Sequence, residues 1–323
     1  MISEFDIIRR YFTRPSPGTV LGVGDDAALI KPSMGMELAV STDMLVSGQH
    51  FLAASDPRKL GYKSLAVNLS DMAAMGAKPR WVTLSLALPE PMVRTDEKWV
   101  EAFADGFLGL AHAHQVDLIG GDTTRGPLNI CVTIIGEVAK GKALRRSGAR
   151  PGDDIWVSGR LGDAALALAH EQQRIMLEPG EIDACLPALH TPVARVELGQ
   201  RLIGLAGGAI DISDGLLADL GHILKASNVA AVIKMDEISC SAPIKKYLPQ
   251  MLAIECLLAG GDDYELCFSA PESRRGKIET LSQEQGIALT RIGEINEGEG
   301  LIVLDAAGKT VTLETKGYDH FSI

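Results

Sequence analysis

Apolar and polar positions follow two periods along the chain, and these periods predict a mixed protein of helices and strands. Apolar residues three and four apart predict helices, and short apolar runs bounded by glycine or proline predict strands. In the first part of the chain, helices are predicted at 2–13, 57–76 and 97–114, and strands at 20–30, 38–42, 81–88, 116–119 and 129–138. This alternation indicates an α/β or α+β architecture.

The same alternation resumes after a stretch at 141–153 that is rich in glycine, arginine, lysine and proline. We expect a domain boundary in this stretch, with an N-terminal domain over 1–140 and a C-terminal domain over 150–323. Beyond it, helices are predicted at 161–172, 192–206, 215–227 and 272–285, and strands at 154–158, 209–212, 229–234, 264–269 and 301–304.

The net charge and the cysteine content disfavour a nucleic-acid-binding protein and a disulfide-bonded one. The net charge of −11 disfavours a nucleic-acid binder and means that phosphate ligands would need cations to approach the surface. The five cysteines show no Cys-x-x-Cys spacing, which favours reduced thiols in a cytoplasmic protein. The first residues lack a secretory signal pattern, and there is no run of 18 apolar residues, so we expect neither export nor a membrane span.

Aspartates recur beside glycine or small hydroxyl residues, mostly where a predicted strand ends. Seven acids share this setting: Asp25, Asp26, Asp43, Asp71, Asp122, Asp211 and Asp214. Each alone is typical of a turn or a helix cap. Together they predict oxygen ligands for a hard cation such as Mg²⁺ that holds phosphates.

Two glycine-rich segments have the spacing of nucleotide motifs but lack their chemistry. The segment 22–27 matches a dinucleotide fingerprint, yet Asp25 and Asp26 would repel the pyrophosphate. The segment 136–143 is close to a P-loop, but Ala143 replaces the Ser or Thr that would bind magnesium. His112 and His114 are two residues apart on a predicted helix, which favours a solvated helix end over a metal site.

Several segments together resemble the thiamine-monophosphate kinases, nearly from end to end. They are Gly24-Asp25-Asp26-Ala27-Ala28, Ser41-Thr42-Asp43-Met44-Leu45, the segment 66–77 around Asn68-Leu69-Ser70-Asp71, Gly120-Gly121-Asp122-Thr123, Arg146-Ser147-Gly148-Ala149, Asp211-Ile212-Ser213-Asp214-Gly215-Leu216, the segment 260–266 and Gly317-Tyr318-Asp319-His320-Phe321. The segment at 68–71 and the closing segment are specific to this family. The aspartate clusters are shared with a superfamily that includes aminoimidazole ribonucleotide synthetase and selenophosphate synthetase.

This resemblance implies a two-domain aminoimidazole ribonucleotide synthetase-like fold. The N-terminal domain would bind metal and ATP and pair with its counterpart in a homodimer, and ATP would lie in the cleft between the two domains. The implied ligands of several Mg²⁺ ions are Asp26, Ser41, Thr42, Asp43, Asp71, Asp122, Asp211 and Asp214. The implied ATP contacts are Gly121, Asp122, Arg146 and Ser213, and the implied thiamine monophosphate contacts are His50, Asp262 and Tyr318. The implied catalytic groups are Asp43, Asp71, Asp122 and Arg146. The family commonly has Glu and Trp at positions 262 and 318.

The implied reaction moves the γ-phosphoryl group of ATP onto thiamine monophosphate and gives thiamine diphosphate. A phosphate oxygen is already ionised near neutral pH, which fits the absence of a motif for a strong general base. One alternative is another ATP-using synthetase of the superfamily. Selenophosphate synthetase would need a reactive cysteine near the N-terminus, whereas the first cysteine is Cys131. A second alternative is a non-catalytic scaffold or calcium-binding protein, although no EF-hand loop is present.

Overall fold

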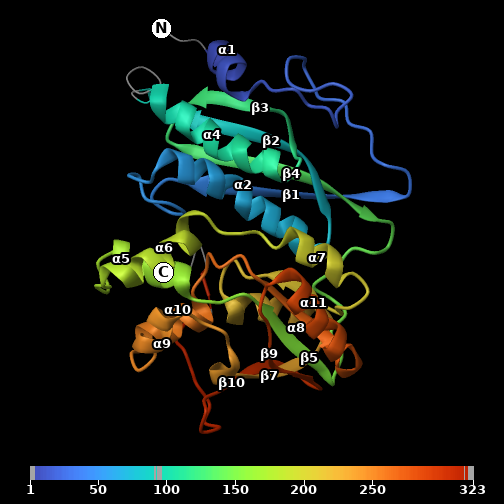
Figure 1. Cartoon of the computed structure of the whole chain (residues 1–323), viewed down its shortest axis with the longest axis vertical. Helices are drawn as coiled ribbons and strands as arrows, with labels where there is room; N and C mark the ends of the chain where they lie inside the picture. Colours follow the sequence, from blue (N-terminus) through green and yellow to red (C-terminus); the bar gives the residue numbers. More distant parts are fainter. Residues whose placement is uncertain (1–3, 91, 93–96, 316, 319–323) are drawn as a thin grey trace. The chain divides into compact units, whose positions relative to one another are not determined.

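The computed structural model describes residues 4–90, 92, 97–315, 317 and 318. The chain divides into two compact units, one comprising Met1–Met72 and Ala77–Gly141 and the other comprising Ala73–Gly76 and Lys142–Ile323. Each unit contains one β-sheet together with helices (Figure 1). The predicted mixed α/β architecture is therefore confirmed.

The first unit has a four-stranded sheet in the order β1-β4-β2-β3. Its strands are β1 (Met36–Val46), β2 (Lys78–Leu88), β3 (Asp117–Arg125) and β4 (Asn129–Ala139). β4 pairs antiparallel with both β1 and β2, and β2 pairs parallel with β3. β1 and β3 therefore form the two edges of the sheet.

Two helices of the first unit, α2 (Pro57–Ala74) and α4 (Glu97–Ala113), lie side by side over one face of this sheet (Figure 1). Their backbones approach closely because Gly61 and Gly106 have no side chains. A Cβ atom at Gly61 would lie 2.0 Å from the carbonyl oxygen of Phe103, and one at Gly106 would lie 1.9 Å from that of Arg58. The face below the helices is apolar and buried, with Leu45 and Ile134 among its residues.

The other face of the sheet is apolar at its β1 edge and remains exposed. Alternate residues of a strand point to opposite faces, and on β1 the exposed set includes Leu38, Val40 and Met44. Val40 is 62% exposed and Met44 is 55% exposed, although both belong to a regular paired strand. We refer to Leu38, Val40 and Met44 as the open face of β1.

The acidic segments of the first unit do not all lie at strand ends, as the apolar runs had predicted. Asp43 and Asp122 lie inside β1 and β3, because both strands continue beyond their apolar residues. The predicted strand at 20–30 is also wrong: it forms isolated bridges, such as Leu21 with Leu29, in place of a regular strand. Its glycines and adjacent acids interrupt the apolar run, and glycine weakens a strand interior.

The N-terminal helix predicted at 2–13 is split in the structure. A short helix, α1 (Glu4–Ile7), leads into a π-helical turn at Ile8–Phe12. Residues 2 and 3 of the prediction lie outside the described residues. Tyr11 and Phe12 are buried and anchor this segment.

The second unit has a six-stranded sheet in the order β10-β7-β9-β5-β8-β6. Its strands are β5 (Asp153–Ser158), β6 (Ala209–Asp211), β7 (Ala230–Lys234), β8 (Leu266–Pro271), β9 (Leu289–Asn296) and β10 (Gly300–Leu304). Only β7 and β10 pair in parallel among the described pairs. All six residues of β5 are buried, so both faces of this central strand are covered.

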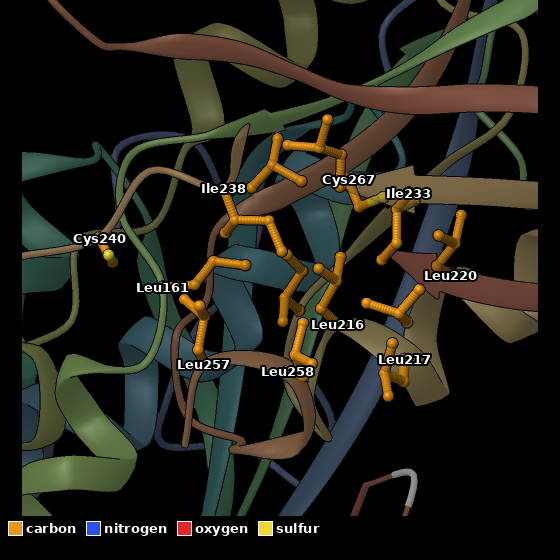
Figure 2. Packing of buried hydrophobic residues seen from close by; sticks show 14 of the residues in the cluster. Leu161, Leu216, Leu217, Leu220, Ile233, Ile238, Cys240, Leu257, Leu258 and Cys267 are labelled. Carbon is orange, nitrogen blue, oxygen red and sulfur yellow. The ribbon is translucent and has the colours of Figure 1, made fainter. Parts of the chain in front are cut away.

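Helices supply most of the remaining core of the second unit. They are α5 (Asp163–Glu171), α6 (Pro179–His190), α7 (Val196–Leu202), α8 (Leu216–Ser227), α9 (Ala242–Tyr247), α10 (Met251–Ala259) and α11 (Arg275–Gln285). Figure 2 shows how Leu216 and Leu220 of α8 pack with Leu257 and Leu258 of α10 in one apolar cluster. This packing fixes the start of α8 next to the loop that follows α10.

Three helices and one strand of this unit, α6, α9, α10 and β9, were not predicted from the sequence. Pro187 lies inside α6 and Pro243 lies in the first turn of α9, and proline interrupts the helical pattern of a sequence. Proline is tolerated in the first turn of a helix because its missing N–H would have no partner there. α10 is almost wholly apolar, and β9 lacks a clean alternation. None of the helices in the described part is both long and apolar enough to cross a membrane.

Candidate functional site

Two candidate residues of the first unit, Ser41 and Asp71, meet where β1 passes beneath α2, and Asp43 lies on the same face of β1. Ser41 and Asp43 are two residues apart on β1 and share the face that carries the buried Leu45. The Ser41 hydroxyl donates a hydrogen bond of 2.5 Å to Oδ2 of Asp71, which lies on α2. The structure therefore brings these oxygen atoms from strand and helix to one place.

Thr42 lies between them but presents its side chain to the opposite face of β1. Its hydroxyl lies 2.9 Å from that of Thr133 on β4. The alternation of a strand requires this separation from Ser41 and Asp43. Any role of Thr42 at the same ion would have to use its backbone carbonyl.

Asp122 lies on β3, at the opposite edge of the sheet from Asp43. Because β4 and β2 lie between β1 and β3, the two backbones are separated by three strand intervals, roughly 14 Å. Asp122 lies opposite Ser85 and is exposed. The preceding Gly121 has a φ of +146°, and a Cβ atom there would lie 1.8 Å from the carbonyl oxygen of Leu84. One ion therefore cannot be bound directly by both aspartates.

Asp26 and His50 lie in turns of the first unit. Asp26 is exposed, and its backbone N–H donates to the carboxylate of Asp25 over 2.9 Å. His50 follows β1, and its Nδ1 accepts a 3.0 Å hydrogen bond from the backbone N–H of Val46. Nδ1 therefore carries no proton, which leaves Nε2 as the ring donor.

In the second unit, acidic residues gather between β6 and α8. Asp211 ends β6 and is buried, and Asp214 follows in the connecting loop. The Asp219 carboxylate, in the first turn of α8, accepts the backbone N–H groups of Ser213, Asp214 and Gly215 at 3.0, 3.0 and 3.1 Å. The loop that follows Asp211 and carries Ser213 and Asp214 is thus folded around the carboxyl group of a third acid, Asp219.

Asp219 did not emerge from the sequence pattern. Burial is the main reason that its pKa rises to about 7, and the nearby charges of Asp211 and Asp214 raise it further. Three carboxyl groups this close repel one another in the absence of a cation. An acid in the first helical turn after a glycine was the available signal, but it is also common in ordinary helix starts.

The same loop holds the two candidate thiamine monophosphate contacts of the second unit. The backbone N–H of Asp262 donates to the carbonyl oxygen of Ser213 over 2.9 Å, and that of Tyr318 donates to the carbonyl oxygen of Asp214 over 3.0 Å. The carbonyl groups of the consecutive residues Ser213 and Asp214 therefore hold the backbones of Asp262 and Tyr318 against this loop. The side chain of Tyr318 is 47% exposed.

Arg146 lies near the other end of β6, with an exposed side chain. The carbonyl of the preceding Arg145 accepts the Ala209 N–H over 2.8 Å, and the Ser227 hydroxyl contacts the Arg146 carbonyl at 3.4 Å. Ala209 is two residues before Asp211, roughly 7 Å along a strand. The backbone of Arg146 therefore lies beside the start of the strand whose far end leads into the acidic loop.

Within the described residues, no three His, Cys, Asp or Glu side chains are arranged so that they could hold a metal ion by themselves. The donors that do come together, such as Ser41 with Asp71 and Asp211 near Asp214, are all oxygen atoms. Mg²⁺ prefers oxygen ligands and is commonly held by one or two carboxylates together with substrate phosphates. The residues present therefore fit magnesium that arrives with a nucleotide.

Comparison with known proteins identifies both parts of the chain. Residues 24–138 match the family described as AIR synthase related protein, N-terminal domain. Residues 150–305 match the family described as AIR synthase related protein, C-terminal domain. The two matches follow each other in the order that the two structural units have along the chain.

Similar proteins match over nearly the whole length. Thiamine-monophosphate kinase of Escherichia coli strain K12 is 45% identical over 324 residues, which cover 99% of this chain and 98% of that protein. The crystal structure of thiamine-monophosphate kinase from Stenotrophomonas maltophilia K279a is 47% identical, with a TM-score of 0.84 over 94% of this chain and 95% of that one. The structure described as AaThiL complexed with AMPPCP and TMP is 31% identical, with a TM-score of 0.78 over 98% and 96% of the two chains. The chain belongs to the thiamine-monophosphate kinase family.

Proposed function

We propose that this protein transfers the γ-phosphoryl group of ATP to thiamine monophosphate and so forms thiamine diphosphate. The observation that carries this proposal is the 45% identity to a thiamine-monophosphate kinase across 99% of the chain. The complex of the relative AaThiL with AMPPCP, an ATP analogue, and TMP supports a direct reaction between the two substrates.

The chemistry requires two anions to meet. The attacking oxygen belongs to a phosphate that is largely ionised at pH 7, so no general base has to remove a proton. Unit charges ~4 Å apart repel by roughly 4 kcal/mol at an effective dielectric constant of 20. The residues of the site therefore have to neutralise and align charge, as is general for phosphoryl transfer.

Magnesium, when bound, would supply positive charge that screens this repulsion. Within the first unit, Asp43, Asp71 and the Ser41 hydroxyl would form one binding position. The backbone carbonyl of Thr42 would supply a further oxygen ligand there. Asp26 and Asp122 would bind separately from this group, since Asp122 lies on the opposite edge of the sheet. Within the second unit, Asp211 and Asp214 would form a further position.

The ATP contacts would come from backbone and arginine groups. Gly121 presents a backbone without a side chain next to Asp122, and Ser213 lies in the acidic loop beside β6. The exposed guanidinium of Arg146 would neutralise charge on the transferring phosphoryl group, because its fork of N–H groups matches phosphate oxygens. These roles assign ATP binding to both units of the chain.

Three side chains would contact thiamine monophosphate. Nε2 of His50 is the ring nitrogen available to donate, since Nδ1 accepts the Val46 N–H. The exposed Tyr318 ring would stack on the cationic thiazolium, an attraction worth about 0.5–2 kcal/mol. The Asp262 carboxylate would complement the same positive charge.

The open face of β1 supports a homodimer formed through the first unit. Leu38, Val40 and Met44 present an apolar surface on a regular edge strand, and such surfaces are characteristic of interaction sites. A second copy of the same sheet would cover this surface with a matching one, which is the usual form of a two-fold interface. We assign dimerisation, metal–ATP binding and the His50 contact to 1–140. The metal position at Asp211 and Asp214 and the contacts of Ser213, Asp262 and Tyr318 belong to 150–323.

The cysteines are compatible with the cytoplasm as the compartment of this activity. All five are free thiols, and Cys185, Cys240, Cys256 and Cys267 are buried. Reduced thiols persist in the cytoplasm, where ATP is also abundant.

The test is an assay of the purified chain with thiamine monophosphate, ATP and magnesium, with the products identified by mass. We expect thiamine diphosphate and ADP in equal amounts. A parallel reaction with formylglycinamidine ribonucleotide tests the synthetase alternative. Turnover of that compound, without thiamine diphosphate formation, would replace the proposed function with the alternative.

A further inference from the structure

The connection between α10 and β8 contains two residues in an unusual backbone conformation. Asp262 has a φ of +69° and Tyr264 a φ of +50°. The other residues with positive φ in the described part, glycine aside, are Gln115, Gln173 and Asn228, and each follows the end of a helix. That setting is common for left-handed residues, whereas two such residues within three positions of a connection require a local cause.

The connection is held in place by backbone hydrogen bonds to the acidic loop. Asp262 N–H donates to the Ser213 carbonyl, and Tyr264 N–H donates to the Ile212 carbonyl over 2.8 Å. Ile212 N–H donates in turn to the Glu265 carbonyl over 2.8 Å. Asp262, Tyr264 and Glu265 of the connection are therefore tied to the loop between Asp211 and Asp214.

The next residue, Glu265, fixes the other end of the connection. Its buried carboxylate accepts Nε of Arg195 at 2.6 Å, pairs with the second guanidinium nitrogen of Arg195, and accepts the Ser158 hydroxyl at 2.5 Å. The same Ser158 oxygen accepts the Leu266 N–H over 2.9 Å. The backbone around Tyr264 is thus restrained on both sides.

Within this restrained segment, Tyr264 turns back on Asp262. The ring of Tyr264 is buried, with 9% of the residue exposed, and its hydroxyl donates a 2.8 Å hydrogen bond to Oδ1 of Asp262. The two left-handed residues are what allow side chains two positions apart to meet, since in an extended strand they would be parallel neighbours about 7 Å apart. The strained conformation and the hydrogen bond are therefore parts of one arrangement.

We propose that Tyr264 is a positioning residue whose hydroxyl fixes the Asp262 carboxylate in the orientation that receives the cationic ring of thiamine monophosphate. This inference rests on the proposed function and on the contact of Asp262 with that substrate. A carboxylate on a freely rotating side chain loses rotamer entropy when it binds, and a carboxylate already held by a buried phenol does not. Tyr264 therefore contributes to binding of the acceptor substrate without contacting it.

The test compares Tyr264→Phe with the wild type in steady-state kinetics. Phenylalanine keeps the buried ring and removes only the hydroxyl. We expect KM for thiamine monophosphate to rise about ten-fold, as for a lost hydrogen bond to a charged group, while KM for ATP and kcat stay within about two-fold. A KM for thiamine monophosphate within about two-fold of the wild type would overturn the inference.

Tyr247→Phe is the matched control. The Tyr247 hydroxyl also donates to a carboxylate, Oε2 of Glu181, over 2.9 Å, but it lies on α9 at the contact with α6. This variant makes the same chemical change in the same unit and is expected to leave both KM values unchanged. A KM for thiamine monophosphate raised as much in Tyr247→Phe as in Tyr264→Phe would indicate a general effect of tyrosine loss and would overturn the inference.

A double-mutant cycle separates positioning from an independent role of the hydroxyl. Asp262→Gly removes the carboxylate, and glycine tolerates the positive φ at this position. If Tyr264 acts only through Asp262, adding Tyr264→Phe to Asp262→Gly leaves KM for thiamine monophosphate unchanged. Multiplicative effects of the two changes would contradict the proposed role.

The proposed function and this inference fail in different ways. If the wild-type chain forms no thiamine diphosphate, the proposed function falls, and the inference falls with it. If the wild type forms thiamine diphosphate and Tyr264→Phe behaves like Tyr247→Phe, only the inference falls.

Discussion

The Ser41 hydroxyl and the Asp71 carboxylate are joined by a 2.5 Å hydrogen bond that links β1 to α2. The two residues are 30 positions apart in the chain, and neither belongs to a turn. Asp71 would be an ordinary helix residue without this partner. The bond instead places its carboxylate against Ser41, on the face of β1 that also carries Asp43, among the residues to which we assign magnesium binding.

We expect Asp71→Asn to lower kcat by at least ~100-fold, because the neutral amide would no longer balance a divalent cation at the transferring phosphate. Steady-state assays with saturating ATP and magnesium measure this. Asp105→Asn is the matched control in the same unit, since Asp105 forms an exposed ion pair with Arg58. Near-normal turnover of Asp71→Asn would remove Asp71 from the metal site.

Removal of divalent cations should abolish phosphoryl transfer and leave the fold intact. The donors assigned to magnesium are partial sets that phosphate oxygens complete, so the ion is not needed to hold the chain together. We expect EDTA to eliminate thiamine diphosphate formation, added Mg²⁺ to restore it, and the circular dichroism spectrum to remain unchanged. Turnover in metal-free buffer would contradict the scheme.

The stability of the second unit should fall as the pH rises, through Asp263. Burial raises the pKa of Asp263 well above its usual value, although the Gly162 N–H donates to both of its carboxylate oxygens. The folded state therefore binds the proton more tightly than the unfolded state, and stability is lost as the pH rises above the unfolded pKa of about 4 toward the folded one. Below about pH 4 both states are protonated, so this loss is absent there.

We expect Asp263→Asn to be more stable than the wild type at pH 8, with a difference that shrinks toward pH 5. Urea unfolding at several pH values measures this difference. Asp305→Asn is the control, because Asp305 is less buried than Asp263 and precedes an exposed turn at 306–308. Identical pH profiles for Asp263→Asn and the wild type would show that burial does not govern this carboxyl group.

The Arg195–Glu265 pair should contribute far more to stability than a surface pair does. Glu265 is 7% exposed at its side chain and Arg195 is 20% exposed. Removing one partner of a buried pair leaves an uncompensated charge, so we expect Arg195→Gln to cost about 3 kcal/mol of unfolding free energy. Arg201→Gln breaks the exposed pair with Glu284 and should cost about 1 kcal/mol or less. Equal losses in both variants, measured by urea unfolding, would contradict this ranking.

A charge on the open face of β1 should separate the proposed dimer. Val40→Asp would place a carboxylate in the centre of the apolar contact, where a buried unpaired charge is costly. Sedimentation velocity should show a dimer for the wild type and a monomer for this variant. Val193→Asp is the control, because Val193 is exposed to a similar degree in the second unit. A wild-type chain that sediments as a monomer would remove the dimer from the proposal.

The spacing of apolar residues was sufficient to predict the helices and strands that bury one continuous apolar face. Trp99, Phe103 and Phe107 recur at helical spacing, and they are buried on α4. The regular apolar run of β2 was equally clear. β3 was predicted too short because Gly120, Gly121 and Asp122 resemble a turn, whereas pairing with β2 keeps them in the strand.

The candidate site depended more on three-dimensional contacts than on local pattern. The acidic segments were visible in the sequence, but strand alternation separates the Thr42 side chain from Ser41, and the order of strands separates Asp43 from Asp122. Asp219 was missed because its role comes from a carboxylate that folds back onto the preceding loop. Local propensity carries no information about such a contact.

The carboxylate of Asp219 has one further consequence for how a nucleotide is recognised. The N–H groups at the start of a helix normally offer a docking point for a bare phosphate. Here the three N–H groups of the loop that leads into α8, those of Ser213, Asp214 and Gly215, already donate to the Asp219 carboxyl group, so this loop does not offer them to a phosphate. A triphosphate without a metal would meet the carboxyl groups of Asp211 and Asp214 beside this loop. The loop would thus discriminate between the metal-loaded and the metal-free forms of the nucleotide before any bond is broken.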